Sequence, residues 1–224
     1  LSSEMGVTFQ LKAYASIPKF EDDILNGGPD FAYMNPYHAV MAKDAQGYDP
    51  IVKDKTELVG ILVVNKAGGV KSLKDLNGQS IVFPSPNAFA ASLYMRALLT
   101  EKEKIRFTPK YVKTHQNVYR NVAVGVAPAG GGVQKTLEKE DPSLKDQLSV
   151  FYKTPGSASH PVAAHSRISK QFRKNAERAI LKLAADPKNK DLFKNIQIPA
   201  PVSASYRKDY FPLKQLGLEK YVEI

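Results

Sequence analysis

The chain has 224 residues, of which 43% are hydrophobic and 24% charged, the composition of a globular protein that can bury a core. Its longest apolar run, residues 58–64, is far shorter than the roughly 18 residues that a membrane helix needs. The absence of cysteine excludes disulfides, thiolate metal sites and thiol nucleophiles. The net charge of +10 favours anionic partners. Because the basic residues are spread out and no aromatic RNA-binding signature accompanies them, we expect no binding of nucleic acid.

Strand and helix signals alternate along the chain and predict an α/β fold with mostly parallel sheets. An apolar/polar alternation predicts a strand at 7–13, and the spacing of Phe20, Ile24 and Leu25 predicts a helix at 17–25. The other predicted strands are 30–34, 58–65, 80–83, 108–112 and 148–152. The other predicted helices are 37–44, 87–100, 116–124 and 166–185, with short helical segments at 72–76, 191–196 and 214–216.

Turn residues bracket the middle of the chain. Gly68-Gly69 and Pro155-Gly156 mark two crossings, which is the pattern of one lobe inserted into another. We therefore expect a first lobe of residues 1–64 plus 158–224, a second lobe of residues 65–157, and a hinge between them.

Five segments carry motifs whose order is informative. Gly28–Pro36 fits G-x-D-F-A-Y-x-x-P, and Ser72–Phe83 is similar to S-L-x-D-L-x-G-K-x-V-A-F. Thr114–Val118 fits S/T-H-x-x-V, Ala123–Gly125 is similar to A-V-x-x-G, and His160 with the following proline precedes a helix. In this order, over residues 5–185, the chain resembles periplasmic substrate-binding proteins of the phosphate, phosphite and phosphonate ABC transporters.

The resemblance implies a two-lobed class II periplasmic-binding fold that clamps a small phosphorus oxyanion and delivers it to the membrane subunits of an ABC importer. It implies a periplasmic or membrane-anchored extracytoplasmic location. We expect a monomer without cofactor, metal or catalytic residues. The family pattern places a strand and a helix before Leu1, and the chain begins with neither Met nor a signal peptide. We therefore expect that this first strand and most of the helix are missing, and that Leu1–Gly6 is the helix end.

The candidate site departs from the family pattern at three places. A Ser-Thr-Ser-Gly run of the phosphonate binders is replaced here by residues 86–92, where Ala88, Phe89 and Ala90 stand in place of hydroxyls. Leu58 replaces a tyrosine and Pro128 an acidic residue. These changes predict a pocket for a larger or more apolar ligand, against which the Phe89 ring could stack.

Helix N-termini and strand ends are the two kinds of position at which we expect ligand-binding groups. Unpaired amides and the helix dipole favour an oxyanion after Ser85 and Asn87, and His115 and Asn117 begin the next helix. Polar residues after strand ends line ligand clefts in open α/β sheets. The full set of expected ligand-binding residues is Tyr33, Asn35, Tyr37, Ser85, Asn87, Ala88, Phe89, Ala90, His115, Asn117, Ser159 and His160.

Each of these residues has a structural alternative. Ser85 and Asn87 can be ordinary helix caps, His115 a satisfied histidine, and Tyr33 and Tyr37 core aromatics. The glycine run 130–132 could form an anion-binding nest, but we interpret it as a flexible loop.

Three other functions remain as alternatives. The first is the ligand-sensing domain of a membrane receptor with the same fold. The second is an enzyme on this fold, which we do not expect because no histidine lies in a metal or catalytic spacing and no G-x-S-x-G is present. The third, a nucleic-acid binder, would show steep salt dependence.

Overall fold

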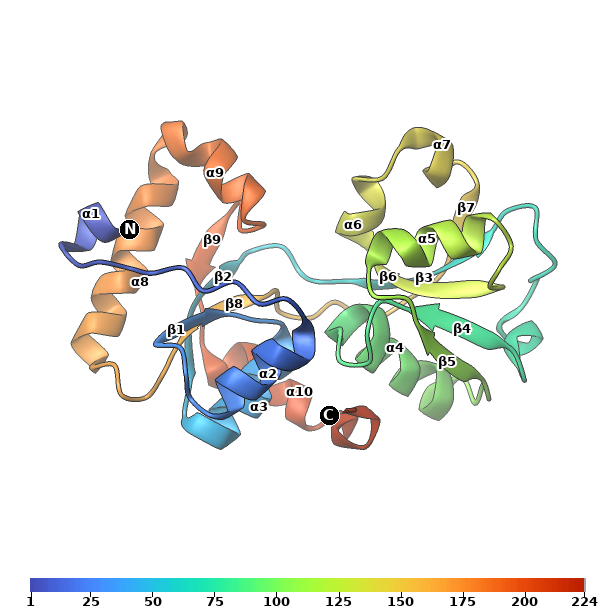
Figure 1. Ribbon diagram of the computed structural model, residues 1–224, viewed down its shortest axis with the longest axis horizontal. Coiled ribbons are helices and arrows are strands. Elements are labelled where there is room, and N and C mark those ends of the chain that lie inside the picture. The colour runs from blue at the N-terminus through green and yellow to red at the C-terminus, as the bar shows by residue number, and fades with distance from the viewer. Residues whose placement is uncertain (224) are drawn as a thin grey trace. The chain divides into compact units, whose positions relative to one another are not determined.

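The structure, a computed structural model, describes residues 1–223. The chain divides into two compact units (Figure 1). The first comprises Leu1–Glu57 and Ser157–Leu216, and the second comprises Leu58–Gly156 and the C-terminal segment from Gly217. The expected lobes placed residues 58–64 and the C-terminal tail in the first unit. Both belong to the second, because residues 60–64 lie inside its sheet and the tail bonds to its helical residues.

Most predicted elements form within a few residues of their expected bounds. The strands are β1 (Phe31–Tyr33), β2 (Asp49–Asp54), β3 (Gly60–Asn65), β4 (Ser80–Phe83), β5 (Thr108–Tyr111), β6 (Ala129–Val133), β7 (Leu148–Lys153), β8 (Pro161–Ala164) and β9 (Pro201–Ser203). The α-helices are α1 (Ser2–Met5), α2 (Ile17–Leu25), α3 (Pro36–Gln46), α4 (Tyr94–Ala97), α5 (His115–Ala123), α6 (Gln134–Glu138), α7 (Pro142–Lys145), α8 (Lys170–Ala185), α9 (Lys190–Asn195) and α10 (Phe211–Lys214).

Short 3₁₀ and π-helical segments complete the chain. They are η1 (Leu73–Leu76), η2 (Phe89–Leu93), η3 (Leu98–Lys102), η4 (Pro187–Asn189), η5 (Tyr206–Tyr210) and η6 (Leu218–Tyr221). The segments η2, α4 and η3 follow one another directly and form a single helical stretch where we predicted a helix at 87–100. Within residues 1–223, no helix is long and apolar enough to cross a membrane.

The first unit contains a four-stranded sheet in the order β1-β8-β2-β9. Every pairing in this order is antiparallel, which corrects the expectation of mostly parallel sheets. The strand–helix–strand run β1-α3-β2 does give two strands with the same direction, since both pair antiparallel with β8. Because β8 enters from the far end of the chain and lies between them, the local pattern could not predict the pairing.

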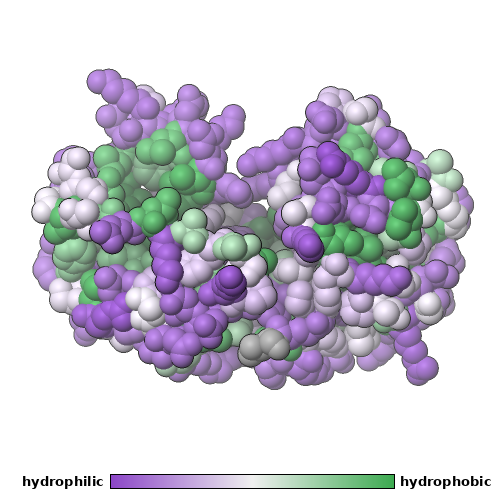
Figure 2. All heavy atoms as spheres, viewed as in Figure 1, coloured by the Kyte–Doolittle hydropathy of each residue, from purple (hydrophilic) through white to green (hydrophobic). Residues whose placement is uncertain are grey.

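The predicted strand at 7–13 does not form. These residues are irregular, and the Leu11 side chain is 97% exposed. A groove of about 910 Å³ is lined on one side by residues 7–12 and on the other by β1, with Phe172 of α8 also contributing. Figure 2 shows apolar side chains gathered on this face of the first unit. The prediction was wrong because a strand needs a hydrogen-bonded neighbour, and residues 7–13 pair with none of the strands that the structure describes.

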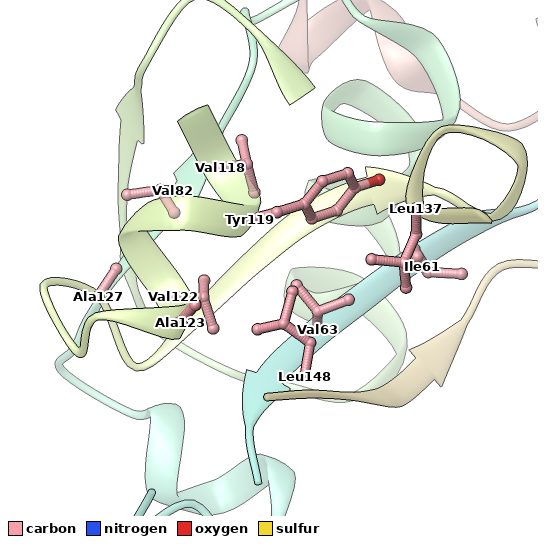
Figure 3. Close-up of a cluster of buried hydrophobic side chains, with 10 residues drawn as sticks. All are labelled: Ile61, Val63, Val82, Val118, Tyr119, Val122, Ala123, Ala127, Leu137 and Leu148. Carbon is pink, nitrogen blue, oxygen red and sulfur yellow. The ribbon is translucent and has the colours of Figure 1, made fainter. Parts of the chain in front are cut away.

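The second unit is built on a five-stranded sheet in the order β5-β4-β6-β3-β7. Strand β4 is parallel to β5 and β6, whereas β3 is antiparallel to β6 and β7, so this sheet is mixed. Ile61 and Val63 of β3 join Val118 and Val122 of α5 in one hydrophobic cluster (Figure 3). The alternate β3 residues Leu62 and Val64 pack instead in a cluster with Met95 and Leu99 of the other helical stretch. The long apolar strand is therefore buried on both faces, which accounts for its continuous run of apolar residues.

The glycine run 130–132 is a buried strand, not the flexible loop that we predicted. It lies in β6, in the middle of the sheet. A Cβ atom on Gly131 would lie 2.0 Å from the Ala91 carbonyl oxygen, and one on Gly132 would lie 2.3 Å from the Tyr119 hydroxyl. These glycines are present because the helical residues on both faces approach the β6 backbone closely, which also excludes an anion nest.

Candidate ligand-binding site

The parallel strands β5, β4 and β6 end at one edge of the second unit's sheet, which we call the carboxyl edge. Six buried side-chain polar atoms have no hydrogen-bond partner among residues 1–223. Three of these atoms follow the three strand ends: Ser85 Oγ after β4, His115 Nδ1 after β5 and Gln134 Oε1 after β6. An unsatisfied buried polar atom costs about 1–3 kcal/mol, so such a group in a native fold indicates a missing partner.

The segment Ser85–Ala88, which we call the oxyanion loop, leads from β4 into the helical stretch. The Ser92 and Leu93 backbone amides donate to the Ala88 carbonyl at 2.8 and 3.1 Å, and these hydrogen bonds begin the helix. The amides that precede them begin the helix, where backbone N–H groups lack intrahelical acceptors and the dipole is positive. The structure therefore places the Ser85 hydroxyl beside a helix N-terminus, an arrangement suited to an oxyanion.

His115 is the first residue of α5. Its N-cap is Thr114, whose hydroxyl accepts a hydrogen bond from the Asn117 amide at 3.1 Å. The preceding Lys113 has a φ of 74°, in the left-handed region that non-glycine residues rarely adopt and that is enriched at functional sites. Burial lowers the pKa of His115 to about 4. The imidazole is therefore neutral at pH 7 and can offer a ligand a hydrogen bond but no positive charge.

Gln134 was missed by the sequence analysis. It follows the glycine run that we interpreted as a loop, so nothing marked it as the end of a strand. Its Nε2 donates to Glu138 Oε1 at 3.0 Å, which fixes the amide orientation because a flipped amide would set oxygen against carboxylate. The buried Oε1 is therefore an acceptor, and a donor on a ligand would satisfy it.

Other expected residues of the second unit are engaged in internal contacts. Asn87 exchanges two hydrogen bonds with the Glu223 backbone, at 2.7 and 3.1 Å. Asn117 donates to the Val112 carbonyl at 2.9 Å. The Phe89 ring is 2% exposed and stacks on Tyr94 at 5.7 Å, so it fills the interior and is not open for a ligand to stack on. Ala90 is buried against the sheet, and Ala88 is the N-cap residue of η2.

Most of the expected residues of the first unit are also held by their own fold. The Asn35 side chain caps α3 and accepts from the Tyr37 and His38 amides at 2.9 and 2.8 Å. Tyr37 is 5% exposed. The Ser159 hydroxyl donates to the Asp54 carbonyl at 2.7 Å.

Among the expected residues of the first unit, Tyr33 and His160 lie side by side, and Tyr33 is partly exposed to solvent. Tyr33 is 43% exposed, and its ring centroid lies 5.6 Å from that of His160. Strands β1 and β8 are antiparallel neighbours, and Tyr33 is paired with Val162, two residues after His160. This ring pair is the part of the first unit best placed to meet a ligand.

Two α/β units, each assembled from separate stretches of one chain, with polar groups at strand ends, are typical of the two-lobed periplasmic binding proteins. The family described as the periplasmic substrate-binding protein of phosphonate ABC transporters matches residues 1–210. The chain belongs to this family, whose members bind small ligands outside the cytoplasm and work with ABC transporter membrane components.

Solved structures share the fold at low sequence identity. A binding protein of a phosphonate ABC transporter from Pseudomonas aeruginosa has 16% identity and a TM-score of 0.81, over 96% of this chain and 76% of that one. PhnD1 from Prochlorococcus marinus in complex with methylphosphonate has 18% identity and a TM-score of 0.82, over 96% and 87%. A Xanthomonas citri protein bound to ATP has 13% identity and a TM-score of 0.84, over 99% and 90%. No curated protein matches the sequence.

Proposed function

We propose that this chain is the solute-binding component of an ABC importer and that it binds a small phosphonate through the carboxyl edge of its second unit. The observation that carries the proposal is the set of three unsatisfied buried atoms, on Ser85, His115 and Gln134, at the ends of adjacent parallel strands. A ligand that bonds to all three removes three desolvation penalties at once. The family match and the methylphosphonate complex of the Prochlorococcus protein support the choice of a phosphonate.

In this proposal the three side chains have different roles. The Ser85 hydroxyl and the amides at the start of η2 donate to the phosphonate oxygens. His115 is neutral and adds one further hydrogen bond. Gln134 Oε1 can only accept, so it favours a ligand with a protonated oxygen or an amino group on its substituent.

The test is isothermal titration calorimetry with phosphate, phosphite, methylphosphonate, 2-aminoethylphosphonate, sulfate, acetate and ATP. We expect a phosphonate to bind most tightly, and 2-aminoethylphosphonate to bind more tightly than methylphosphonate. ATP is included because a similar protein binds it. If only ATP or no compound binds, the proposal fails and the receptor function with a larger ligand becomes the better one.

A pair of serine variants locates the site. We expect Ser85→Ala to weaken phosphonate binding about tenfold, the effect of one hydrogen bond to a charged group. Ser143→Ala removes the same hydroxyl from an exposed residue of the same unit and should leave the affinity unchanged. Equal affinities of the two variants would place the ligand elsewhere.

Two further parts of the proposal concern assembly and closure. We propose that the protein acts as a monomer, which light scattering coupled to size exclusion tests directly. Closure of two lobes on the ligand remains a prediction from the family resemblance. Small-angle scattering should show a smaller radius of gyration after methylphosphonate is added.

A further inference from the structure

The C-terminal segment Gly217–Glu223, which we call the strap, returns to the second unit and reaches the oxyanion loop. The Asn87 side chain pairs in both directions with the Glu223 backbone. In the middle of the strap, the Tyr221 hydroxyl donates to Glu101 at 2.6 Å, and Lys220 forms an ion pair with the same carboxylate at 2.8 Å. The last residues of the described chain therefore touch the loop that precedes the helix N-terminus.

Arg96 of α4 joins the strap to the loop. Its side chain is buried, and one guanidinium nitrogen, Nη2, donates to the Pro86 carbonyl at 2.9 Å and to the Tyr221 carbonyl at 2.7 Å. Nη1 donates to Glu223 Oε1 at 3.1 Å, and Nε donates to Ser92 Oγ at 3.3 Å. A single planar group thus bonds to the oxyanion loop, to the first helical turn and to both ends of the strap's last three residues.

The guanidinium is also packed between two aromatic rings. Its central carbon lies 5.7 Å from the Tyr111 centroid and 6.0 Å from that of Tyr221. The Tyr111 hydroxyl donates to the same Glu223 carboxylate that pairs with Arg96. Four hydrogen bonds and an ion pair already engage the Arg96 guanidinium, so it is arranged to hold backbone in place, while the hydroxyl of Ser85, the residue before Pro86, has no partner among residues 1–223.

We infer that the strap and Arg96 hold the oxyanion loop in its ligand-binding conformation, with Arg96 as a positioning residue. The inference deepens the proposed function and rests on it for the identity of the ligand. Binding to preorganised amides is strong only when the loop geometry is fixed before the ligand arrives. If Pro86 lost its bond to Arg96 and Asn87 its bonds to Glu223, the ligand would have to order the loop. The free energy spent on this ordering would lower the affinity.

The test compares ligand-free loop dynamics with affinity in one set of variants. Arg96→Gln removes the guanidinium group and its charge, and Arg96→Lys keeps the charge but not the planar set of N–H donors. Lys220→Ala is the control, because it breaks an exposed ion pair of the strap that does not touch the loop. Hydrogen exchange of the peptide that covers residues 84–93 is measured without ligand. The methylphosphonate Kd is measured at a temperature at which near-ultraviolet circular dichroism shows every variant folded.

We expect both Arg96 variants to exchange faster than wild type over residues 84–93 and to bind about tenfold more weakly, with Arg96→Lys no better than Arg96→Gln. Lys220→Ala should match wild type in both measurements. Unchanged exchange in Arg96→Gln overturns the inference whatever the ligand is. Faster exchange with an unchanged Kd overturns it as well, because Arg96 would then be only structural. If wild type binds no phosphonate, the proposed function fails, while the exchange data still decide whether Arg96 positions the loop.

Discussion

Two pairs of expected ligand residues, one pair in each unit, differ in whether the fold satisfies their polar atoms. Both units also hold other buried polar atoms without a partner among residues 1–223, such as His38 Nδ1 in the first unit. In the first unit, Asn35 and Ser159 were expected at a ligand site, and the fold uses each of them for its own hydrogen bonds. In the second unit, Ser85 and His115 were expected for the same reason, and each keeps a buried atom without a partner among residues 1–223. Both groups contain cap-forming residue types next to helix starts, so the sequence could not separate them.

The difference teaches where to look for ligand recognition. A satisfied polar group contributes to stability, and its removal costs folding free energy. An unsatisfied one costs folding free energy until a ligand arrives, so its removal should weaken binding without lowering stability. Three substitutions test this distinction and a fourth tests the packing of the second unit; they follow from the largest expected effect to the smallest.

The largest expected loss of stability comes from a substitution where the helical stretch lies close to the second unit's sheet. We expect Gly131→Ala to lower the free energy of unfolding by about 3 kcal/mol, because the new methyl group would lie 2.0 Å from a backbone oxygen that cannot move aside. Urea unfolding followed by circular dichroism measures the loss. Gly69→Ala, which has nothing within 4 Å, is the matched control and should unfold like wild type. Equal midpoints for both variants would mean that the packing is looser than described.

His115 should make stability depend on pH. Its folded pKa is lowered by burial to about 4, below the ordinary value of 6.5, so the unfolded chain binds the proton more tightly. Protonation of the unfolded chain therefore lowers the free energy of unfolding. This loss is absent above pH 6.5 and grows as the pH falls to 4, where it is on the order of 3 kcal/mol. His115→Asn should therefore lose less stability than wild type over this window, as chemical denaturation at several pH values would show. Parallel curves for the two proteins would contradict the buried neutral imidazole.

Gln134 distinguishes a binding role from a structural one within the second unit. We expect Gln134→Met to weaken binding of 2-aminoethylphosphonate about tenfold and to leave sulfate binding nearly unchanged, because sulfate has no protonated oxygen or amino group that could donate to Oε1. The thermal midpoint without ligand should not fall, since the bond lost, to Glu138, is on the surface. An equal loss for both ligands would assign Gln134 to the oxyanion itself.

A substitution of Asn35 in the first unit should lower stability and leave ligand binding unchanged, the reverse of the result expected for Gln134. Asn35→Ala removes a side chain that caps α3 with two amide bonds, so we expect it to lower the free energy of unfolding by about 1 kcal/mol. The phosphonate Kd should stay within twofold of wild type. A large loss of affinity with intact stability would instead support the direct ligand role that we first expected for Asn35.

The local elements could be predicted because their signals are local. Helix α2 and strand β4 have the predicted bounds, Ile17–Leu25 and Ser80–Phe83. The run Leu58–Val64 predicts a strand buried on both faces, and the structure buries it between two helical layers. The motif order also predicted the family, which the match over residues 1–210 confirms.

Tertiary structure decided the pairing of strands and the fate of each polar group. Residues 7–13 have the alternation of a strand, and residues 130–132 have the composition of a loop, yet only the second segment has neighbours on both sides. Ser85 and Asn87 are two residues apart and equally polar. Asn87 is satisfied by the Glu223 backbone, far away in the sequence, whereas the Ser85 hydroxyl has no partner among residues 1–223. Sequence patterns report what a segment can do, whereas long-range contacts determine which hydrogen bonds remain to be made.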